Sequence, residues 1–292
     1  MKKKTNLEHS QIANNLMYYI YRHIDSSINL DELAQSLGVS KFHLHRLFKK
    51  QIGSNIYETI KSIRLQKASN LLITNTSSTI TEIANICGYS SQTSFIRAFK
   101  NRFAMTPKFW RKGGYRNHSD QILQTSPTAS LSTADYSNLE PNIIKTQAKK
   151  AYYIRHKGYN KKIRQTWQKM MAWVYSNEVE EYEQIGIYHD NPIITPLEEC
   201  FYISAIHIKG EKKLENTSLP HFEIPAGIYA TFEVEGRYGD ILKLIQWAYH
   251  EWLPQSGFET STHPSYTILK RNHFLEGDER FKVVYYLPIL FI

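Results

Sequence analysis

Apolar residues recur every three or four positions through the first third of the chain, which is the period of amphipathic helices. Asn29 and Ser40 stand where helices can be capped, and Gly38 suits the left-handed turn that ends a helix. The pattern predicts an all-helical domain over residues 9–112, preceded by a basic N-terminal tail over residues 1–8. Its clearest stripes are Ile12, Leu16, Ile20 and Ile24, and then Ile56, Ile60, Ile63, Ala68 and Leu71.

Two segments of this helical region repeat each other. In both, a short predicted helix is followed by a Gly-containing turn and by a second helix whose outer face is basic. This order is typical of a helix-turn-helix motif, and its tandem duplication is far more specific than a single copy. The aligned pairs, at an offset of 50 and then 51 residues, are Leu30 with Ile80, Glu32 with Glu82, Leu33 with Ile83, Ala34 with Ala84, Gly38 with Gly88, Val39 with Tyr89, Ser40 with Ser90, Leu44 with Phe95, Arg46 with Arg97, Phe48 with Phe99 and Lys49 with Lys100.

Strand periodicity replaces helical periodicity in the second half of the chain. Residues 113–140 are rich in Ser and Thr and predict a surface linker, against which Ile122 and Leu123 can dock. Beyond them, two strand-like stretches each lead through a Gly-bearing turn into an amphipathic helix. This duplicated unit predicts an α+β domain over residues 141–292, an antiparallel sheet with both helices on one face. The predicted strands are residues 151–156, 201–208, 228–235 and 282–291. The turns are Lys157-Gly158-Tyr159 and Gly236-Arg237-Tyr238-Gly239. The apolar stripe of the first helix is Ile163, Trp167, Met170 and Val174, and that of the second is Ile241, Leu244, Ile245, Ala248 and Trp252.

Charge separates the two halves. Residues 1–112 carry 17 Lys and Arg against 6 Asp and Glu, a net charge of +11, whereas residues 113–292 carry 19 against 21, a net charge of −2. A basic block of domain size points to a polyanion partner for the first half only. The aromatic content of 13% argues against disorder, no apolar run is long enough to cross a membrane, and Cys87 and Cys200 provide no disulfide framework. We therefore expect a soluble cytoplasmic protein.

The second helix-turn-helix motif and the residues after it follow a known family pattern. The matching residues are Ile83-Ala84, Cys87-Gly88-Tyr89, Phe95, Arg97, Phe99-Lys100, Thr106-Pro107 and Trp110-Arg111. On these residues the helical region resembles the AraC/XylS family of bacterial transcription regulators, and within it the MarA-, SoxS- and Rob-like subgroup. Two departures, Ala104 in place of the family's Gly and Ser54-Asn55 in place of Thr-Pro, lie at helix ends behind the reading surface. The resemblance implies a transcription regulator that binds double-stranded DNA in the major groove.

Outward positions on the second helix of each motif are the candidate DNA contacts. Arg46 can make paired hydrogen bonds to guanine, Phe42 can pack on a thymine methyl group, and His45 can bond a base edge or a phosphate. Gln92 suits adenine, and Arg97 suits guanine or a phosphate. The family resemblance implies that Phe42, His45 and Arg46 read bases and that Lys49 and Lys50 bind phosphate. The full sets are Lys41, Phe42, His45, Arg46, Lys49 and Lys50, and then Ser91, Gln92, Thr93, Arg97 and Lys100.

Enzymatic chemistry has little support in the sequence. His43 and His45 invite a metal interpretation, but residues two apart on a helix point to different sides. In the second half, spacing singles out no Ser/His/Asp or paired-carboxylate arrangement. We expect no catalytic residue, metal or cofactor, and a protein that is not an enzyme.

Four segments of the second half carry a further resemblance. They are Ile185-Gly186-Ile187-Tyr188-His189-Asp190-Asn191-Pro192 with Thr195-Pro196, Pro225-Ala226-Gly227-Ile228-Tyr229-Ala230, Trp252-Leu253-Pro254 with Ser256-Gly257-Phe258-Glu259, and Leu287-Pro288. On these segments, residues 142–292 resemble the GyrI-like effector-binding domain, whose pocket usually holds a Glu in a "P.FE.Y" motif. Thr267 takes the Glu position here, so the resemblance implies a small-molecule effector that is neutral, apolar or aromatic. The candidate ligand-binding residues are Tyr188, Tyr202, Trp252, Tyr266 and Thr267.

Two alternatives stay open at this point. Some GyrI-like proteins are hydrolases that use the pocket carboxylate, so the chain can be a hydrolase fused to a DNA-binding domain. Thr267 argues against this because a Thr cannot supply a carboxylate's charge for general base catalysis. In the other alternative the second half is a protein-interaction module that binds no small molecule. RNA polymerase is the protein partner that the family resemblance suggests.

Overall fold

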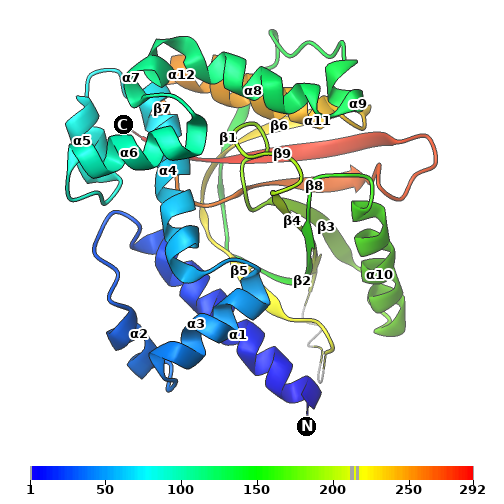
Figure 1. Cartoon of the computed structure of the whole chain (residues 1–292). Helices are drawn as coiled ribbons and strands as arrows, with labels where there is room; N and C mark the ends of the chain where they lie inside the picture. Colours follow the sequence, from blue (N-terminus) through cyan, green and yellow to red (C-terminus); the bar gives the residue numbers. More distant parts are fainter. Residues whose placement is uncertain (1, 211–213, 215–216, 292) are drawn as a thin grey trace. The chain divides into compact units, whose positions relative to one another are not determined.

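A computed structural model describes residues 2–210, 214 and 217–291 of the chain. The chain divides into two compact units, Met1–Gly114 and Tyr115–Ile292 (Figure 1). The first unit is helical and the second combines helices with one antiparallel sheet. The predicted fold class, an all-α domain followed by an α+β domain, is confirmed.

Helices account for the regular structure described in the first unit. Their bounds are α1 (Lys2–Arg22), α2 (Leu30–Ser36), α3 (Lys41–Ile52), α4 (Ile56–Thr74), α5 (Ile80–Ile86), α6 (Gln92–Phe103), α7 (Pro107–Phe109) and the π-helical turn η1 (Trp110–Gly114). The prediction of a tail over residues 1–8 is wrong, because α1 begins at Lys2 and continues without a break into the predicted stripe. Of that stripe, Leu16 and Ile20 in α1 and Ile24 just after it are buried in the core of the first motif.

Local capping explains where the helices of the two motifs begin. The Asn29 side chain accepts hydrogen bonds from two backbone N–H groups of α2, and the Ser40 hydroxyl accepts one from His43 N at 3.2 Å. Thr79 and Glu82 form a reciprocal capping box at the start of α5. Ala104 adopts the left-handed φ of 55° that the family's Gly usually supplies, so the turn is kept despite the departure.

The second unit contains both helices and strands. The helices are α8 (Tyr115–Gln124), α9 (Pro127–Ser130), α10 (Ile163–Ser176), α11 (Asp240–Trp247), the π-helical turn η2 (Ala248–Trp252) and α12 (Leu253–Gln255). The strands are β1 (Asn142–Thr146), β2 (Lys149–Lys157), β3 (Tyr182–Tyr188), β4 (Phe201–Ile208), β5 (His221–Ile224), β6 (Gly227–Arg237), β7 (Phe258–Thr260), β8 (Ser265–Arg271) and β9 (Arg280–Phe291).

The segment predicted as a linker, residues 113–140, contains helical structure instead. α8 buries Tyr115, Ser119, Ile122 and Leu123, which follow a helical spacing that the Ser- and Thr-rich composition concealed. The predicted docking of Ile122 and Leu123 is therefore part of a ten-residue helix. The Ser126 hydroxyl caps the short α9 that follows.

One curled sheet of nine strands organises the second unit (Figure 1). The strands lie in the order β1-β6-β9-β8-β3-β4-β2-β5, β7 pairs with β9, and all pairings are antiparallel. Tyr152 of β2 packs on Trp173 of α10, with ring centroids 5.1 Å apart, and Phe232 of β6 packs on Trp247 of α11 at 5.6 Å. The registers place both of these residues on the same face, so α10 and α11 cover one side of the sheet as predicted.

Candidate nucleic-acid interface and ligand site

The outer face of α3 projects the first predicted set of contacts into solvent. Arg46, Lys49 and Lys50 are exposed, while Leu44, Leu47 and Phe48 are buried on the opposite side. The Phe42 ring is 77% exposed, an unusual place for an apolar side chain of this size. An exposed ring among free cations is suited to a surface that is covered only when a polyanion binds.

Two of the α3 residues are held by neighbours. Lys41 Nζ donates a hydrogen bond of 2.8 Å to Asp31 Oδ2, and this bond raises the pKa of the lysine. The half-buried His45 ring lies 5.4 Å, between centroids, from the ring of Tyr57, which is 59% exposed on the first turn of α4. Tyr57 was not singled out from the sequence, because it lies outside both repeated motifs.

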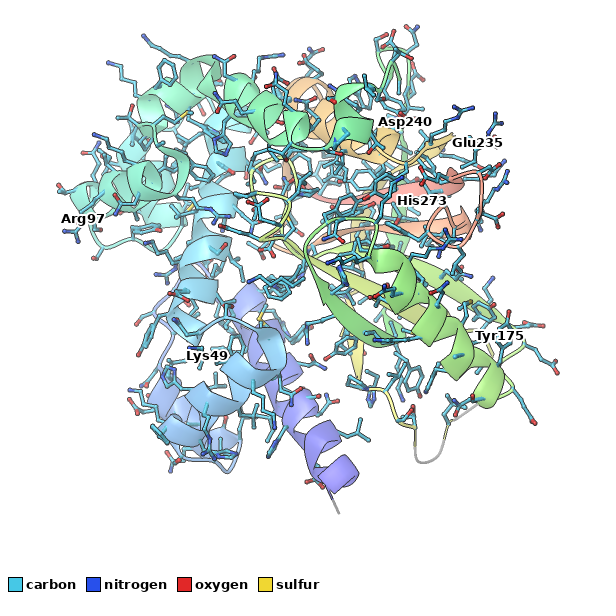
Figure 2. The ribbon with its side chains drawn as sticks, turned by 45° about the vertical axis from the view of Figure 1, so that its right-hand side comes forward. Lys49, Arg97, Tyr175, Glu235, Asp240 and His273 are labelled. Carbon is cyan, nitrogen blue, oxygen red and sulfur yellow. The ribbon has the colours of Figure 1, made fainter. Side chains whose placement is uncertain are left out.

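α6 presents the second set in the same way. Gln92, Thr93, Arg97 and Lys100 are exposed, and Figure 2 shows Arg97 at the outer edge of the helix. Ser91 is the N-cap, and its hydroxyl accepts a hydrogen bond of 3.2 Å from Ser94 N. It therefore acts on the interface by fixing the helix start rather than as a free hydroxyl.

Arg64 of α4 ties the two motifs together. Its guanidinium donates to the carbonyl of Ile24 at 2.9 Å and to that of Ser26 at 2.7 Å, both just after α1. Gly88, in the turn of the second motif, has φ of +74° and lies so close that a Cβ there would be 2.8 Å from the Arg64 guanidinium and from the Ile24 carbonyl. The relative placement of α3 and α6 therefore rests on direct packing as well as on the rigid α4.

The recognition faces also keep their charge available. Within the part of the chain that the structure describes, Arg46, Lys49, Lys50, Arg97 and Lys100 take part in none of the ion pairs. Unpaired surface cations are the groups that bind phosphate with release of counterions.

In the second unit, three of the five predicted ligand residues come together. Tyr188 and Tyr202 lie with ring centroids 5.8 Å apart, and the Tyr202 hydroxyl covers Gly186 so closely that a Cβ there would collide with it. Thr267 Oγ1 donates a hydrogen bond of 3.3 Å to the Gly186 carbonyl. Tyr188, Tyr202 and Thr267 are 4%, 2% and 1% exposed, so they lie inside the closed protein.

The other two predicted ligand residues lie elsewhere. Tyr266 is adjacent to Thr267 in β8 and points to the opposite face, where its ring stacks on Tyr286 at 4.6 Å. Trp252 packs between Phe232 and Phe258, at 5.3 and 6.3 Å. The structure does not bring these two residues to the Tyr188 side chain.

Three further tyrosines complete a cluster that the sequence prediction missed. Tyr159 lies 5.9 Å from Tyr188, 5.8 Å from Tyr202 and 6.4 Å from Tyr238, and Tyr285 lies 6.3 Å from Tyr188. Tyr159 and Tyr238 stack at an interplanar angle of 8°. Both come from the Gly-bearing turns of the duplicated unit, which is the sequence signal that pointed to them. We call the five residues the tyrosine cluster.

The tyrosine cluster is uncharged. Burial raises the pKa of the Tyr159, Tyr202 and Tyr285 hydroxyls well above their ordinary range, and the pKa of Tyr188 is raised for the same reason. Next to the cluster, His273 lies 5.6 Å from Tyr238, and burial lowers its pKa to about 3, so its imidazole is neutral. Glu235 of β6 is at the surface and pairs with Lys282 at 2.7 Å (Figure 2).

A separate surface cavity of about 280 Å³ opens beside α8 and α11. Arg116 and Glu251 form a two-bonded ion pair at its wall, and Gln246 donates a hydrogen bond of 2.6 Å to Asp120. Beneath it, His250 is 3% exposed, and burial lowers its pKa to about 3, with Arg116 adding to the shift. These hydrogen bonds join side chains within the cavity wall.

Metal and membrane sites were also sought in the described residues. Among these residues, no three His, Cys, Asp or Glu side chains gather as a metal-ligand set. Over the same residues, no helix combines the length and the apolar character needed to span a bilayer.

Comparison with known proteins identifies both units. The sequence profile of the "GyrI-like small molecule binding domain" matches residues 139–290, and that of a "Helix-turn-helix domain" matches residues 33–113. The chain is 38% identical over 95 residues to the xylose operon regulatory protein of Escherichia coli K12, an alignment that covers 32% of this chain and 24% of that protein. It is 35% identical over 106 residues to the right origin-binding protein of the same strain, covering 36% of each.

Two further matches to the helical region cover most of the related chain. The transposon Tn10 TetD protein of Escherichia coli is 36% identical over 104 residues, which are 36% of this chain and 75% of TetD. The solved C-terminal domain of AraT, a response regulator from Geobacillus stearothermophilus, is 32% identical with a TM-score of 0.33, and covers 35% of this chain and 84% of that domain. Since the GyrI-like profile spans more than half of its length, the chain belongs to the GyrI-like family of small-molecule-binding domains and carries an AraC/XylS-type helix-turn-helix domain before it.

Proposed function

We propose that the protein is a transcription regulator that reads a bipartite DNA site with its first unit and binds a small effector with its second. The observation that carries the DNA-binding half is the duplicated exposed face of α3 and α6, with its unpaired cations and its solvent-exposed Phe42. Such a regulator works in the cytoplasm, where the DNA is, and RNA polymerase is the partner through which it acts.

The two recognition helices divide the contacts by chemistry. Arg46 reads guanine through paired hydrogen bonds and Gln92 reads adenine, while Lys50 and Lys100 neutralise phosphates. Two helices on one rigid linker helix can enter successive major grooves, about 34 Å apart along the duplex. One chain then recognises an asymmetric site.

Affinity and salt dependence test the DNA-binding half. The full chain selects a preferred duplex from a random pool, and its binding constant is then measured between 50 and 200 mM salt. With ~6–10 phosphate contacts the affinity falls by about 10³–10⁵ over this range. Lys169→Ala, an exposed lysine on α10, is the matched control that leaves the slope unchanged. Selection of no sequence, or a salt-independent affinity, contradicts the proposal.

Two substitutions separate reading from anchoring. Arg46→Ala relaxes the base preference at one position and costs about 1–3 kcal/mol on the best site, because a bidentate contact is lost. Lys50→Ala weakens all sequences alike and reduces the salt slope by about one contact. Equal losses on specific and random DNA for Arg46→Ala identify that residue as a phosphate anchor instead.

The second unit is proposed to bind its effector without hydrolysing it. Supporting this, Thr267 stands where hydrolases of this type use a carboxylate, and its hydroxyl is engaged by the Gly186 carbonyl. The tyrosine cluster around Gly186 is neutral, which favours an uncharged ligand because burying an unpaired charge is costly.

A further inference from the structure

We propose that Tyr57 of α4 is a further DNA contact, which bonds a phosphate in the spacer between the two half-sites and holds His45 in place to read its base. The inference rests on the proposed DNA-binding role of the first unit. It adds to that role a residue outside both repeated motifs, and it assigns to that residue one particular stretch of the duplex.

The Tyr57 side chain lies at the surface with its polar end free. It is 59% exposed on the first turn of α4. Over the described residues, its hydroxyl makes no hydrogen bond with another protein group. A tyrosine combines an apolar ring with a polar tip, which suits a surface that another molecule covers. The hydroxyl can therefore donate to a phosphate oxygen without breaking a bond inside the protein.

One side of the Tyr57 ring packs against the first recognition helix. The ring centroids of Tyr57 and His45 lie 5.4 Å apart, and the ring planes meet at 33°. Tyr57 also lies near Lys41, at the start of α3, because it adds to the raised pKa of that lysine, whose main cause is the hydrogen bond to Asp31. Recognition helices contact bases with their N-terminal residues. A donor beside that end of α3 is therefore placed to reach the backbone at the edge of the same groove.

The other side of Tyr57 borders a surface cavity of about 490 Å³ between the two motifs. Ser26 and Ser27 line this cavity from the first motif's side, and Asn85 and Ser90 line it from the second motif. Tyr57 is thus on the side of α3 that faces the second motif. When the two recognition helices occupy successive major grooves, the DNA on this side is the spacer between them. The phosphate within reach of Tyr57 therefore belongs to the spacer and not to an outer flank.

The charges at this cavity favour a neutral donor as the contact. In the described lining, the Arg64 guanidinium already donates to the carbonyls of Ile24 and Ser26, and Asp25 contributes a carboxylate. Asp25 repels a phosphate from the interior of the cavity, which leaves the Tyr57 rim as the place for it. A neutral hydroxyl neutralises no phosphate and releases no counterion, so its contribution to affinity differs from that of a lysine in its salt dependence.

Removing the hydroxyl alone tests the phosphate contact. Tyr57→Phe in the full chain should bind the selected duplex and a random duplex about tenfold more weakly, because a hydrogen bond to a charged acceptor is lost. Its salt slope should equal that of the unmodified chain, whereas Lys50→Ala reduces the slope by about one contact. Tyr175→Phe, at a 73% exposed position on α10 (Figure 2), is the matched control and should change neither affinity nor slope.

Modified DNA locates the phosphate. Single phosphates of the selected duplex are replaced in turn by uncharged methylphosphonates, in the spacer and in both flanks. At one spacer position the replacement should weaken the unmodified chain and leave Tyr57→Phe no weaker than before, since two changes to one hydrogen bond are not additive. At every other position the two proteins should respond by the same factor.

Removing the ring tests the effect on His45. His45→Ala first identifies the base pair that this histidine reads, by selection from a random pool. Tyr57→Ala should lower discrimination at that same pair by about three- to tenfold, the effect of losing one aromatic contact, whereas Tyr57→Phe should preserve it. The melting temperatures of both variants should stay close to that of the unmodified chain, because the side chain is exposed.

Three outcomes overturn the inference. They are a Tyr57→Phe variant that binds the selected duplex as tightly as the unmodified chain, a methylphosphonate scan in which no spacer position separates the two proteins, and a Tyr57→Ala variant that keeps full discrimination at the pair read by His45. If the unmodified chain selects a duplex and any of these results is found, the assignment of Tyr57 alone is wrong. If the unmodified chain selects no duplex, the proposed function is wrong as well.

Discussion

Acidification between pH 6.5 and 5 should destabilise the second unit, because burial lowers the pKa of several of its histidines. His250 and His273 make the largest contributions, and His156, His189 and His221 add to the effect in the same direction. His250 and His273 are 3% and 4% exposed, and burial lowers the pKa of each to about 3 from an ordinary value of 6.5. The pKa of each histidine is lower in the folded protein than in the unfolded chain. Below pH 6.5 the unfolded chain therefore binds a proton that the folded protein does not bind, and the free energy of unfolding falls as the pH falls.

The magnitude follows from the pKa shift. Between the unfolded and folded pKa values, each group lowers the free energy of unfolding by about 1.4 kcal/mol per pH unit. From pH 6.5 to 5 this amounts to about 1.5–2 kcal/mol for each histidine and about 3–4 kcal/mol for both. Carboxylates such as Glu183 and Asp278, whose pKa values are lowered, act only below about pH 4.5, outside this window.

Urea unfolding of the full chain at a series of pH values measures the effect. The fluorescence reports mainly on the second unit, which contains Trp167, Trp173, Trp247 and Trp252. His273→Phe should reduce the pH slope by one proton, about 1.4 kcal/mol per pH unit, because Phe places a neutral ring among Tyr238, Phe274 and Phe281. His23→Phe, at an exposed position in the first unit, should leave the slope unchanged.

The reasoning is refuted if the free energy of unfolding stays flat from pH 6.5 to 5. It is also refuted for His273 if the His273→Phe variant keeps the slope of the unmodified chain. A slope that falls equally in the His23 control would mean that the effect arises from general charge repulsion and not from burial.

Three further predictions concern caps, packing and the pocket. Thr79→Ala removes the capping box of α5 and should lower the stability of the first unit by about 1 kcal/mol in thermal unfolding. Gly88→Ala should lower the melting temperature of that unit more than Gly38→Ala, although φ is positive at both positions. A Cβ at Gly88 would contact Arg64 and the Ile24 carbonyl, whereas a Cβ at Gly38 would contact nothing within 4 Å. Equal melting temperatures for the two variants would refute this. Thr267→Glu should shift the binding preference of the full chain from neutral 2-methylnaphthalene toward cationic N-methylquinolinium in a tryptophan-fluorescence titration, since a carboxylate favours a nearby cation. An unchanged preference would mean that Thr267 does not line the effector site.

Local features of the sequence were sufficient for the helices of the two repeated motifs in the first unit, but not for the start of α1. The helical stripe, the caps at Asn29 and Ser40 and the duplicated motif predicted α2 through α6 and the outward direction of Arg46 and Arg97. They were sufficient because helix period and capping depend on residues a few positions apart. The same reasoning failed at α8, whose four buried positions are spaced correctly but diluted by polar residues.

The placement of the candidate ligand residues was decided by tertiary structure. Tyr266 and Thr267 are neighbours in sequence, but successive side chains of a strand point to opposite faces of the sheet. Because both residues are buried, their hydrophobicity alone does not tell which one faces α10 and α11. Tyr159 and Tyr238 are far apart in the chain and stack only because the two halves of the duplicated unit meet in one sheet. Contacts of this kind depend on strand order and register, which are set by the packing of the whole sheet and leave only indirect traces in the sequence.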